Sequence, residues 1–279
     1  MGSVGCLGVR AATDLVRPRL GRNPGTCLHD RMRRLFPVPD DRGAQEEVDV
    51  ATAYSLPDDA HLRAVFIASA DGAAVSGDGR SGGLSGETDR RLLKQLRALT
   101  DAVLVGGATV RTEGYGTVGL SDEAQQRRRD AGLAPRPPIV IVSASARFDP
   151  GAAVFVESNE LPIVLTSEAA AKERGRDLSG LAEVVPAGKD TVHLPTALER
   201  LRDRGLLRLQ FEGGPSLFGR LLAEDLVDEL CLTIAPSVVG GDLPRIIGKL
   251  PAVDPPRRMR LTDLFGDEED FLFARYALR

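Results

Sequence analysis

Short apolar runs alternate with amphipathic stretches along most of the chain. Runs of strand length occupy Arg63–Ala68, Ala102–Val105, Pro138–Ser143, Leu161–Thr166, Glu183–Val185 and Leu207–Glu212. Between them, residues 85–99, 121–131, 168–174, 196–204 and 216–223 have helical spacing or helix-forming composition, with Ser85 as the expected cap of the first helix. This alternation over residues 61–225 predicts a mainly parallel sheet that helices cover on both faces.

Two longer runs near the C-terminus have a different pattern. Val227–Ala235 and Asp270–Ala277 alternate between apolar and polar residues, which is typical of strands with one buried face. We expect these two strands to pair antiparallel. The sequence therefore predicts one α/β domain over residues 61–279, with a mainly parallel sheet and an antiparallel C-terminal strand pair.

Residues 1–60 differ from the rest in composition. Residues 1–36 hold seven arginines against two acids, a charge of +5, so the remainder carries −9 because the whole chain carries −4. This Gly-, Arg- and Pro-rich stretch has no helical or strand period and no apolar signal-peptide core. We expect a disordered or irregular leader over 1–60. An Arg-rich transit peptide, a nucleic-acid arm or a true start at Met32 are the alternatives.

Composition and charge exclude several classes of function. The apolar runs are too short to cross a bilayer, so no membrane partner is expected. A net charge of −4 argues against a nucleic-acid binder. The three cysteines, Cys6, Cys27 and Cys231, lie far apart and form no CxxC pair. We therefore expect no metal site and no disulfide framework, and a cytoplasmic location.

Two glycine pairs follow predicted strands and precede predicted helices. Gly106-Gly107 comes directly after Ala102–Val105, and Gly213-Gly214 directly after Leu207–Glu212. Ligands of open parallel sheets bind at such strand ends, where glycine lets backbone amides approach a phosphate at a helix N-terminus. Neither pair fits a dinucleotide fingerprint or a P-loop. From the residues alone, each pair is a phosphate site or an ordinary turn.

The order of several short motifs resembles one family. The motifs are Ser69-Ala70-Asp71-Gly72, Leu84-Ser85-Gly86, Leu96-Arg97-Ala98, Val105–Val110, Glu212–Leu217, Leu226–Leu230, Ile234-Ala235-Pro236 and Gly240-Gly241. Together they resemble the C-terminal reductase domain of the bifunctional riboflavin-biosynthesis deaminase/reductase and its stand-alone pyrimidine-reductase relatives. The resemblance covers about residues 61–278. It implies a dihydrofolate-reductase-like, three-layer α/β/α fold, and NADPH-dependent hydride transfer to a small pyrimidine-type substrate.

The resemblance also implies which residues bind the cofactor. They come from the first strand, both glycine turns and the end of the third strand: Ala68, Gly106, Gly107, Thr109, Glu113, Ser143, Glu212, Gly213, Gly214, Pro215, Ser216 and Leu217. The turn 213–217 would hold the pyrophosphate, and Ser143 would lie near the adenosine. Glu212 is expected to bond neighbouring turn amides. Arg111 and Arg147 are rival partners for a 2′-phosphate, or they are ordinary surface residues.

Two acids are candidate catalytic residues. Asp71 would orient the nicotinamide loop, or it is the first residue of an ordinary Asp-Gly turn. Asp89, with Glu87 as its alternative, would face the substrate ring, or it is a first-turn acid that interacts with the helix dipole.

The chain departs from the family pattern on the substrate side. It lacks the H-x-E and P-C-x-x-C motifs of the deaminase half, so it cannot perform that zinc-dependent deamination. Residues 111–116 replace the usual A-D-D-P-x-L stretch, which leaves the substrate open. A ribosylamino-pyrimidine 5′-phosphate, dihydrofolate, and a non-catalytic NADP-binding module are the alternatives. The resemblance further implies a homodimer.

Overall fold

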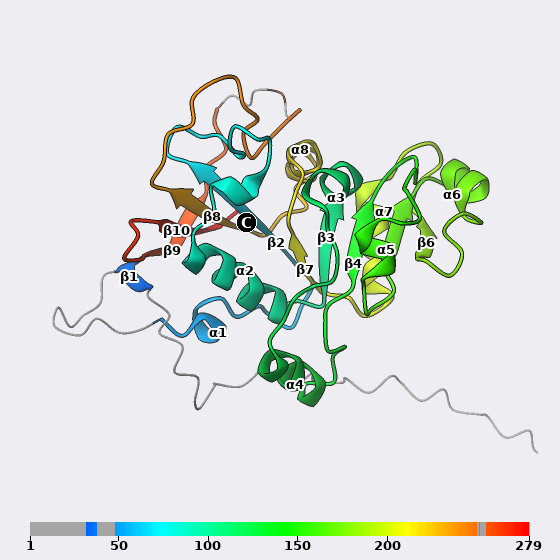
Figure 1. Cartoon of the computed structure of the whole chain (residues 1–279), viewed down its shortest axis with the longest axis horizontal. Coiled ribbons are helices and arrows are strands. Elements are labelled where there is room, and N and C mark those ends of the chain that lie inside the picture. The colour runs from blue at the N-terminus through cyan, green and yellow to red at the C-terminus, as the bar shows by residue number, and fades with distance from the viewer. Residues whose placement is uncertain (1–31, 38–47, 250, 252–254, 279) are drawn as a thin grey trace, which may run out of the picture.

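The computed structural model describes residues 32–37, 48–249, 251 and 255–278, and its strands form one sheet (Figure 1). The strands are β1 (Arg33–Phe36), β2 (His61–Ser69), β3 (Ala102–Gly106), β4 (Ile139–Val142), β5 (Ile163–Thr166), β6 (Glu183–Pro186), β7 (Arg208–Phe211), β8 (Glu229–Ala235), β9 (Arg260–Gly266) and β10 (Leu272–Ala277). The helices are α1 (Val50–Ala53), the 3-10 helix η1 (Ser81–Gly83), α2 (Glu87–Ala98), α3 (Gly107–Glu113), α4 (Asp122–Asp130), α5 (Ala153–Val156), α6 (Glu168–Arg174), α7 (Leu194–Arg202) and α8 (Pro215–Ala223).

The sheet is parallel in its centre and antiparallel at one end. Its strand order is β1-β9-β10-β8-β2-β7-β3-β4-β5-β6, and every pair from β8 to β6 is parallel. The predicted antiparallel pairing of the C-terminal strands is confirmed, because β10 runs antiparallel to β8 from Leu272 opposite Ile234 to Ala277 opposite Glu229. β9 was not predicted from the sequence, and it pairs with β10 on the side away from β8.

Helices cover both faces of this sheet, which confirms the predicted α/β/α layering. On one face, α7 and α8 pack through side chains such as Leu201 and Phe218 against the buried residues of β2, β7 and β3. On the other face, α2 packs through Leu92 and Leu96 beside Ile67 of β2 and Phe273 of β10. Parallel strands with both faces covered read as continuous apolar runs, which is why the central strands were visible in the sequence.

Two described elements lie within the stretch that was expected to be a disordered or irregular leader. β1 and α1 lie within residues 1–60, whereas residues 1–31 and 38–47 lie outside the described residues. Tyr54, only 1% exposed, packs beside Phe265 with a ring-centroid distance of 5.6 Å. Arg63 and Arg275 donate hydrogen bonds to the carbonyl oxygens of Tyr54 and Ala53, at 2.7 and 2.5 Å. Residues 48–54 are therefore part of the fold, because the C-terminal strands supply apolar partners that no local pattern shows.

Local capping differs from the prediction at one helix and explains a histidine at another. Gly86 is the N-cap of α2, and the hydroxyl of the predicted cap, Ser85, donates to Asp89 instead. His193 is the N-cap of α7, where its ring accepts from the Thr196 amide.

None of the helices in the described part of the chain is long and apolar enough to span a bilayer.

Candidate active site

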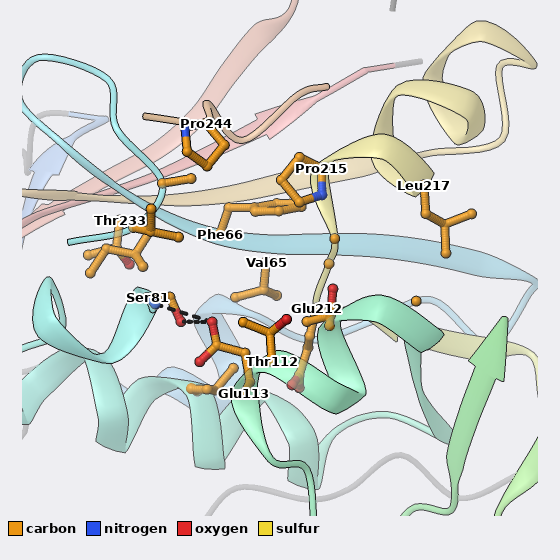
Figure 2. Close-up of a pocket in the computed structure, with 18 of the residues that line it drawn as sticks. Val65, Phe66, Ser81, Thr112, Glu113, Glu212, Pro215, Leu217, Thr233 and Pro244 are labelled. Atoms are coloured by element: carbon orange, nitrogen blue, oxygen red, sulfur yellow. Dashed lines mark hydrogen bonds between the residues drawn. The ribbon is translucent and has the colours of Figure 1, made fainter. Parts of the chain in front are cut away.

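One large cavity opens at the carboxyl ends of the central strands. It has a volume of about 910 Å³ and is lined by residues of β2, α2, α3, β8 and the turn that leads into α8. In Figure 2, Val65 and Phe66 of β2 lie in the middle of the view. Thr233 of β8 lies to one side of them, and Pro215 and Leu217 of α8 lie to the other. The cavity therefore lies at the strand ends that the glycine pairs follow.

The two glycine turns that the sequence placed about a hundred residues apart are in direct contact. The Gly106 amide donates to the Gly213 carbonyl oxygen at 2.7 Å. A Cβ on Gly106 would lie 3.2 Å from the Gly214 nitrogen, so a side chain there would crowd the second turn. Gly213 has a φ of +115°, a conformation that favours glycine. Both turns together form one wall of the cavity.

The second turn presents the N-terminus of α8 to the cavity. Gly214 is the N-cap, Pro215 is the first helical residue, and the Gly214 carbonyl accepts from the amides of Leu217 and Phe218 at 3.0 Å each. Thr109 of α3 faces this turn, since a Cβ on Gly214 would lie 2.6 Å from Thr109 Oγ1. A glycine cradle at a helix N-terminus is a site that favours an anionic group such as a pyrophosphate.

Most residues that the resemblance assigned to the site do line this cavity. They are Asp89, Gly106, Gly107, Thr109, Glu113, Glu212, Gly213, Gly214, Pro215, Ser216 and Leu217. Ala68 and Ser143 do not line it, although the neighbours Ile67, Val142 and Ala144 do. Ser143 instead adjoins the first glycine turn, where a Cβ on Gly107 would lie 3.0 Å from Ser143 Cβ.

Asp71 lies outside the cavity lining, where three hydrogen bonds hold its carboxylate. Its carboxylate accepts from the Ser69 hydroxyl at 2.5 Å and from the amides of Gly240 and Val239 at 2.8 and 3.2 Å. These hydrogen bonds, that of Ser69 foremost, lower the pKa of Asp71 to about 2. Asp71 fastens the loop after β8 to the turn after β2, so it orders this loop without itself lining the cavity.

Of the three acids considered for catalysis, Asp71, Glu87 and Asp89, Asp89 is the one that lines the cavity. It lies in the first turn of α2, where Ser85 donates to it, and Thr233 of β8 lines the same part of the cavity. Burial raises the pKa of Asp89 above its ordinary value of 3.8. Its alternative, Glu87, is 74% exposed and pairs with Arg91 at 2.7 Å. The sequence left these two acids open, and the geometry favours Asp89.

Glu113 and Arg111 stand on two sides of the same short helix. Glu113 Oε1 accepts from the amide and the hydroxyl of Ser81, at 3.2 and 3.3 Å, which links α3 to η1 (Figure 2). Arg111 is exposed, and its Nη1 donates to the Arg147 carbonyl at 3.4 Å. The two arginines that the sequence treated as rivals are therefore neighbours, and Arg111 lies on the helix that begins at Gly107.

Glu212 lines the cavity, but its partners differ from the prediction. Its carboxylate accepts from the side chains of Arg97, Tyr115 and Gln210 and not from the turn amides. Arg97, Tyr115 and Thr233 were not among the predicted site residues, and Arg97 appeared only within the Leu96-Arg97-Ala98 motif. Each comes from a different element, so no local motif brings them together.

Comparison with known proteins assigns the family. Residues 60–273 match the model of the RibD C-terminal domain. A 2,5-diamino-6-ribosylamino-4(3H)-pyrimidinone 5′-phosphate reductase from Methanothermobacter thermautotrophicus is 39% identical over 174 residues, which are 61% of this chain and 75% of that protein. The enzyme of the same name from Archaeoglobus fulgidus is 34% identical over 158 residues, 57% of this chain and 72% of that one.

A solved structure agrees in fold and in sequence. A pyrimidine reductase-like protein from Corynebacterium diphtheriae is 31% identical, with a TM-score of 0.71, and the match covers 80% of this chain and 96% of that one. The family match spans the whole cavity apart from Tyr54 and Ala274, which lie just outside it. The chain therefore belongs to the RibD C-terminal domain family, the reductase family that its motifs resemble.

Proposed function

We propose that this chain is an NADPH-dependent reductase of a ribosylamino-pyrimidine 5′-phosphate in riboflavin biosynthesis. The observation that carries this proposal is the single cavity that joins the glycine cradle of α8 to the buried end at Asp89 and Thr233. Hydride transfer requires a cofactor and a substrate side by side in one water-poor space. The names of the two archaeal relatives support the pyrimidine as substrate.

The residues present fit a nicotinamide dinucleotide. The cradle fits a pyrophosphate because Gly213 and Gly214 place no side chain between the turn amides and the cavity, and the hydroxyl of Thr109 lies beside Gly214. Residues 213–217 would hold the pyrophosphate, with Thr109 beside it. When bound, the nicotinamide supplies the hydride. The chain's own residues supply orientation and exclude water.

Two arginines support NADPH over NADH. Arg111 and Arg147 are adjacent and exposed, and the described contacts of Arg111 include no acid. A guanidinium matches phosphate geometry better than an ammonium does, so this pair would bind the 2′-phosphate. The Arg111→Ala variant should then raise KM for NADPH far more than KM for NADH.

The opposite end of the cavity fits a substrate that combines a polar ring with a phosphate. Asp89 and Thr233 offer hydrogen-bonding groups to the amino and carbonyl groups of a pyrimidine, beside the apolar side chains of Leu92 and Leu96. Arg90, next to Asp89 on α2, also lines the cavity and would neutralise a 5′-phosphate. A pteridine would meet the same acid, which keeps dihydrofolate as the second substrate to test.

The decisive experiment is a turnover assay on the purified chain. NADPH oxidation is followed by loss of its absorbance with the ribosylamino-pyrimidine 5′-phosphate, with dihydrofolate, and with neither. We expect turnover of the pyrimidine phosphate alone. Turnover of dihydrofolate alone would replace the proposed substrate, and NADPH binding without turnover of either would favour a non-catalytic module.

We also propose a cytoplasmic homodimer. Leu35, Phe36 and Leu272 are each more than a third exposed at the β1 end of the sheet, an apolar edge that a second copy would cover. Light scattering that gives a monomer mass at micromolar concentration would contradict the dimer.

The proposed cytoplasmic location is supported by Cys231, which is a free thiol and suits a reducing compartment. Localisation of a fluorescent fusion would test the cytoplasmic location.

A further inference from the structure

Glu212 stands at the point where three cavity-lining elements meet. It follows β7 and directly precedes Gly213-Gly214, and its amide donates to the Leu104 carbonyl of β3 at 3.0 Å. Its side chain is only 4% exposed. A carboxylate in that position is stable only if its charge and its lone pairs are satisfied.

Four hydrogen bonds satisfy this carboxylate. Oε1 accepts from Arg97 Nε at 2.7 Å and from Gln210 Nε2 at 2.8 Å. Oε2 accepts from Arg97 Nη2 at 2.6 Å and from the Tyr115 hydroxyl at 2.8 Å. An ionised carboxylate has about four acceptor positions, so this one has none left for a ligand. Glu212 lines the cavity without being free to bind substrate or cofactor.

The partners of Glu212 come from elements with different tasks. Arg97 belongs to the last turn of α2, whose first turn carries Asp89. Tyr115 follows α3, which carries Thr109, and its ring lies 5.9 Å from the Arg97 guanidinium carbon. Although burial opposes it, the Arg97 charge lowers the pKa of Glu212, and the cluster stays ionic. The buried carboxylate of Glu212 thus links α2, the segment that follows α3, and the glycine turn at Gly213-Gly214.

We propose that Arg97 and Tyr115 are positioning residues, which hold Glu212 and through it the glycine turn at a fixed separation from α2. This inference rests on the proposed function, because that separation sets how the nicotinamide meets the pyrimidine. Bidentate pairing of Arg97 fixes both distance and angle, which a lysine cannot do. A displacement of about 1 Å between reacting groups can cost about 100-fold in rate.

The test uses two conservative variants and a matched control. Arg97→Lys keeps the charge but loses the fork, and Tyr115→Phe removes one hydroxyl at nearly constant volume. The control is Arg208→Lys, because Arg208 forms a buried ion pair with Asp101 at 2.8 Å, and neither residue lines the cavity. This control measures how much Tm falls when a buried arginine–carboxylate pair outside the cavity loses its guanidinium.

For Arg97→Lys we expect kcat to fall at least tenfold, and for Tyr115→Phe about threefold, with the NADPH Kd within threefold of the parent. Amide hydrogen exchange of peptides covering 212–218 in the cofactor-free protein should be faster in both. Arg208→Lys should lower Tm and change neither quantity. Unchanged kcat and exchange in the folded Tyr115→Phe variant would overturn the proposal, as would equal losses in the control.

The outcomes separate this inference from the proposed function. If the parent protein binds NADPH but reduces no pyrimidine, the proposed function fails. The exchange measurement then still decides whether Arg97 and Tyr115 hold the turn. If the parent is active and the variants keep its kcat, only the positioning role fails. If Arg97→Lys does not fold, Tyr115→Phe and its exchange rates decide.

Discussion

Thr109 Oγ1 occupies the space in which a side chain on Gly214 would begin. A Cβ on Gly214 would lie 2.6 Å from that oxygen, closer than real Cβ atoms approach a neighbour. The backbone itself does not require glycine here, because φ of Gly214 is −88°. The requirement is steric, and it comes from the helix that carries the other glycine turn. The cradle therefore depends on a contact between two turns that are distant in sequence.

The first prediction concerns Gly214. The Gly214→Val variant should weaken NADPH binding at least tenfold, or about 1.4 kcal/mol, because the side chain displaces Thr109 and fills the space above the turn amides. Titration with NADPH measures the change. Melting and circular dichroism must show that the variant is folded. Parent-like affinity in a folded variant would place the cofactor elsewhere.

Thr109→Val is the companion variant. It removes one hydroxyl and nearly preserves volume, so it tests a hydrogen bond rather than the shape of the cradle. Loss of one such bond costs about 0.5–1.5 kcal/mol, hence a smaller loss of NADPH affinity than at Gly214. The same titration measures it. An effect larger than that of Gly214→Val would mean that Thr109 shapes the turn itself.

Asp71 should affect the protein through stability and not through a proton near neutral pH. Because its pKa is lowered to about 2, the folded state binds this proton more weakly than the unfolded state. Its contribution to stability is therefore present above the ordinary value of 3.8 and is lost as pH falls toward 2. Asp71→Asn should lower Tm at neutral pH, with a difference that shrinks across this window.

The pH–rate profile gives the second measurement on Asp71. A group with such a pKa stays ionised at every working pH, so the profile between about pH 5 and 9 should keep its shape in Asp71→Asn. A limb that disappears in the variant would restore Asp71 as a catalytic acid.

The parallel core and the glycine turns were predictable because their signals are local. β3 and β4 are apolar throughout and buried on both faces, so a short run of residues is enough to find them. β9 was missed because its sequence RLTDLFG has no clean alternation, and its Asp263 is satisfied by Arg34 and Arg275 from two other segments. A strand whose polar residues pair with residues distant in the sequence lacks the alternation of apolar and polar positions by which a strand is predicted.

The backbone half of the site was predictable and the side-chain half was not. Strand–glycine–helix patterns indicate where amides point, so residues 213–217 were placed correctly in the cavity. The partners of Glu212 were not predictable, since Arg97 lies 115 residues away and Tyr115 lies 97 residues away. For Asp71, the motif gives the residue and not the direction of its carboxylate, which accepts from the Ser69 hydroxyl and from the amides of Val239 and Gly240.

The N-terminal segment offers a test of how far the domain extends. Tyr54→Ala should cost about 3–5 kcal/mol of unfolding free energy, because its ring is almost fully buried beside Phe265 and Arg63. Denaturant unfolding measures this. Leu161→Ala, at a side chain that is 56% exposed, is the control and should change little. A parent-like Tyr54→Ala protein would mean that α1 is not part of the cooperative fold.

The matching truncation concerns residues 1–31. These residues have no apolar face in their sequence, so a chain that begins at Met32 should keep the parent's Tm and its NADPH affinity. A clear fall in Tm on that truncation would show that the first residues contribute to folding.

Asp89 gives the last prediction, which separates substrate binding from cofactor binding. Asp89→Asn should lower kcat/KM for the pyrimidine at least tenfold, or about 1.4 kcal/mol, with an unchanged NADPH Kd, because Asp89 lies on α2 and not on the glycine cradle. Glu87→Gln is the control, since that exposed neighbour pairs with Arg91. Equal effects of the two variants, or none, would remove Asp89 from the site.

The same variant should change stability in a direction that the pKa fixes. Burial raises the pKa of Asp89, so the folded state binds its proton more tightly than the unfolded state. The stability that this carboxyl contributes is fully present below its unfolded pKa and is lost as pH rises through its folded pKa. Asn carries no charge at any pH, so Asp89→Asn should be more stable than the parent at neutral pH. This advantage should shrink on acidification, and loss of activity together with a gain in Tm would show that Asp89 is kept ionised for binding at a cost in stability.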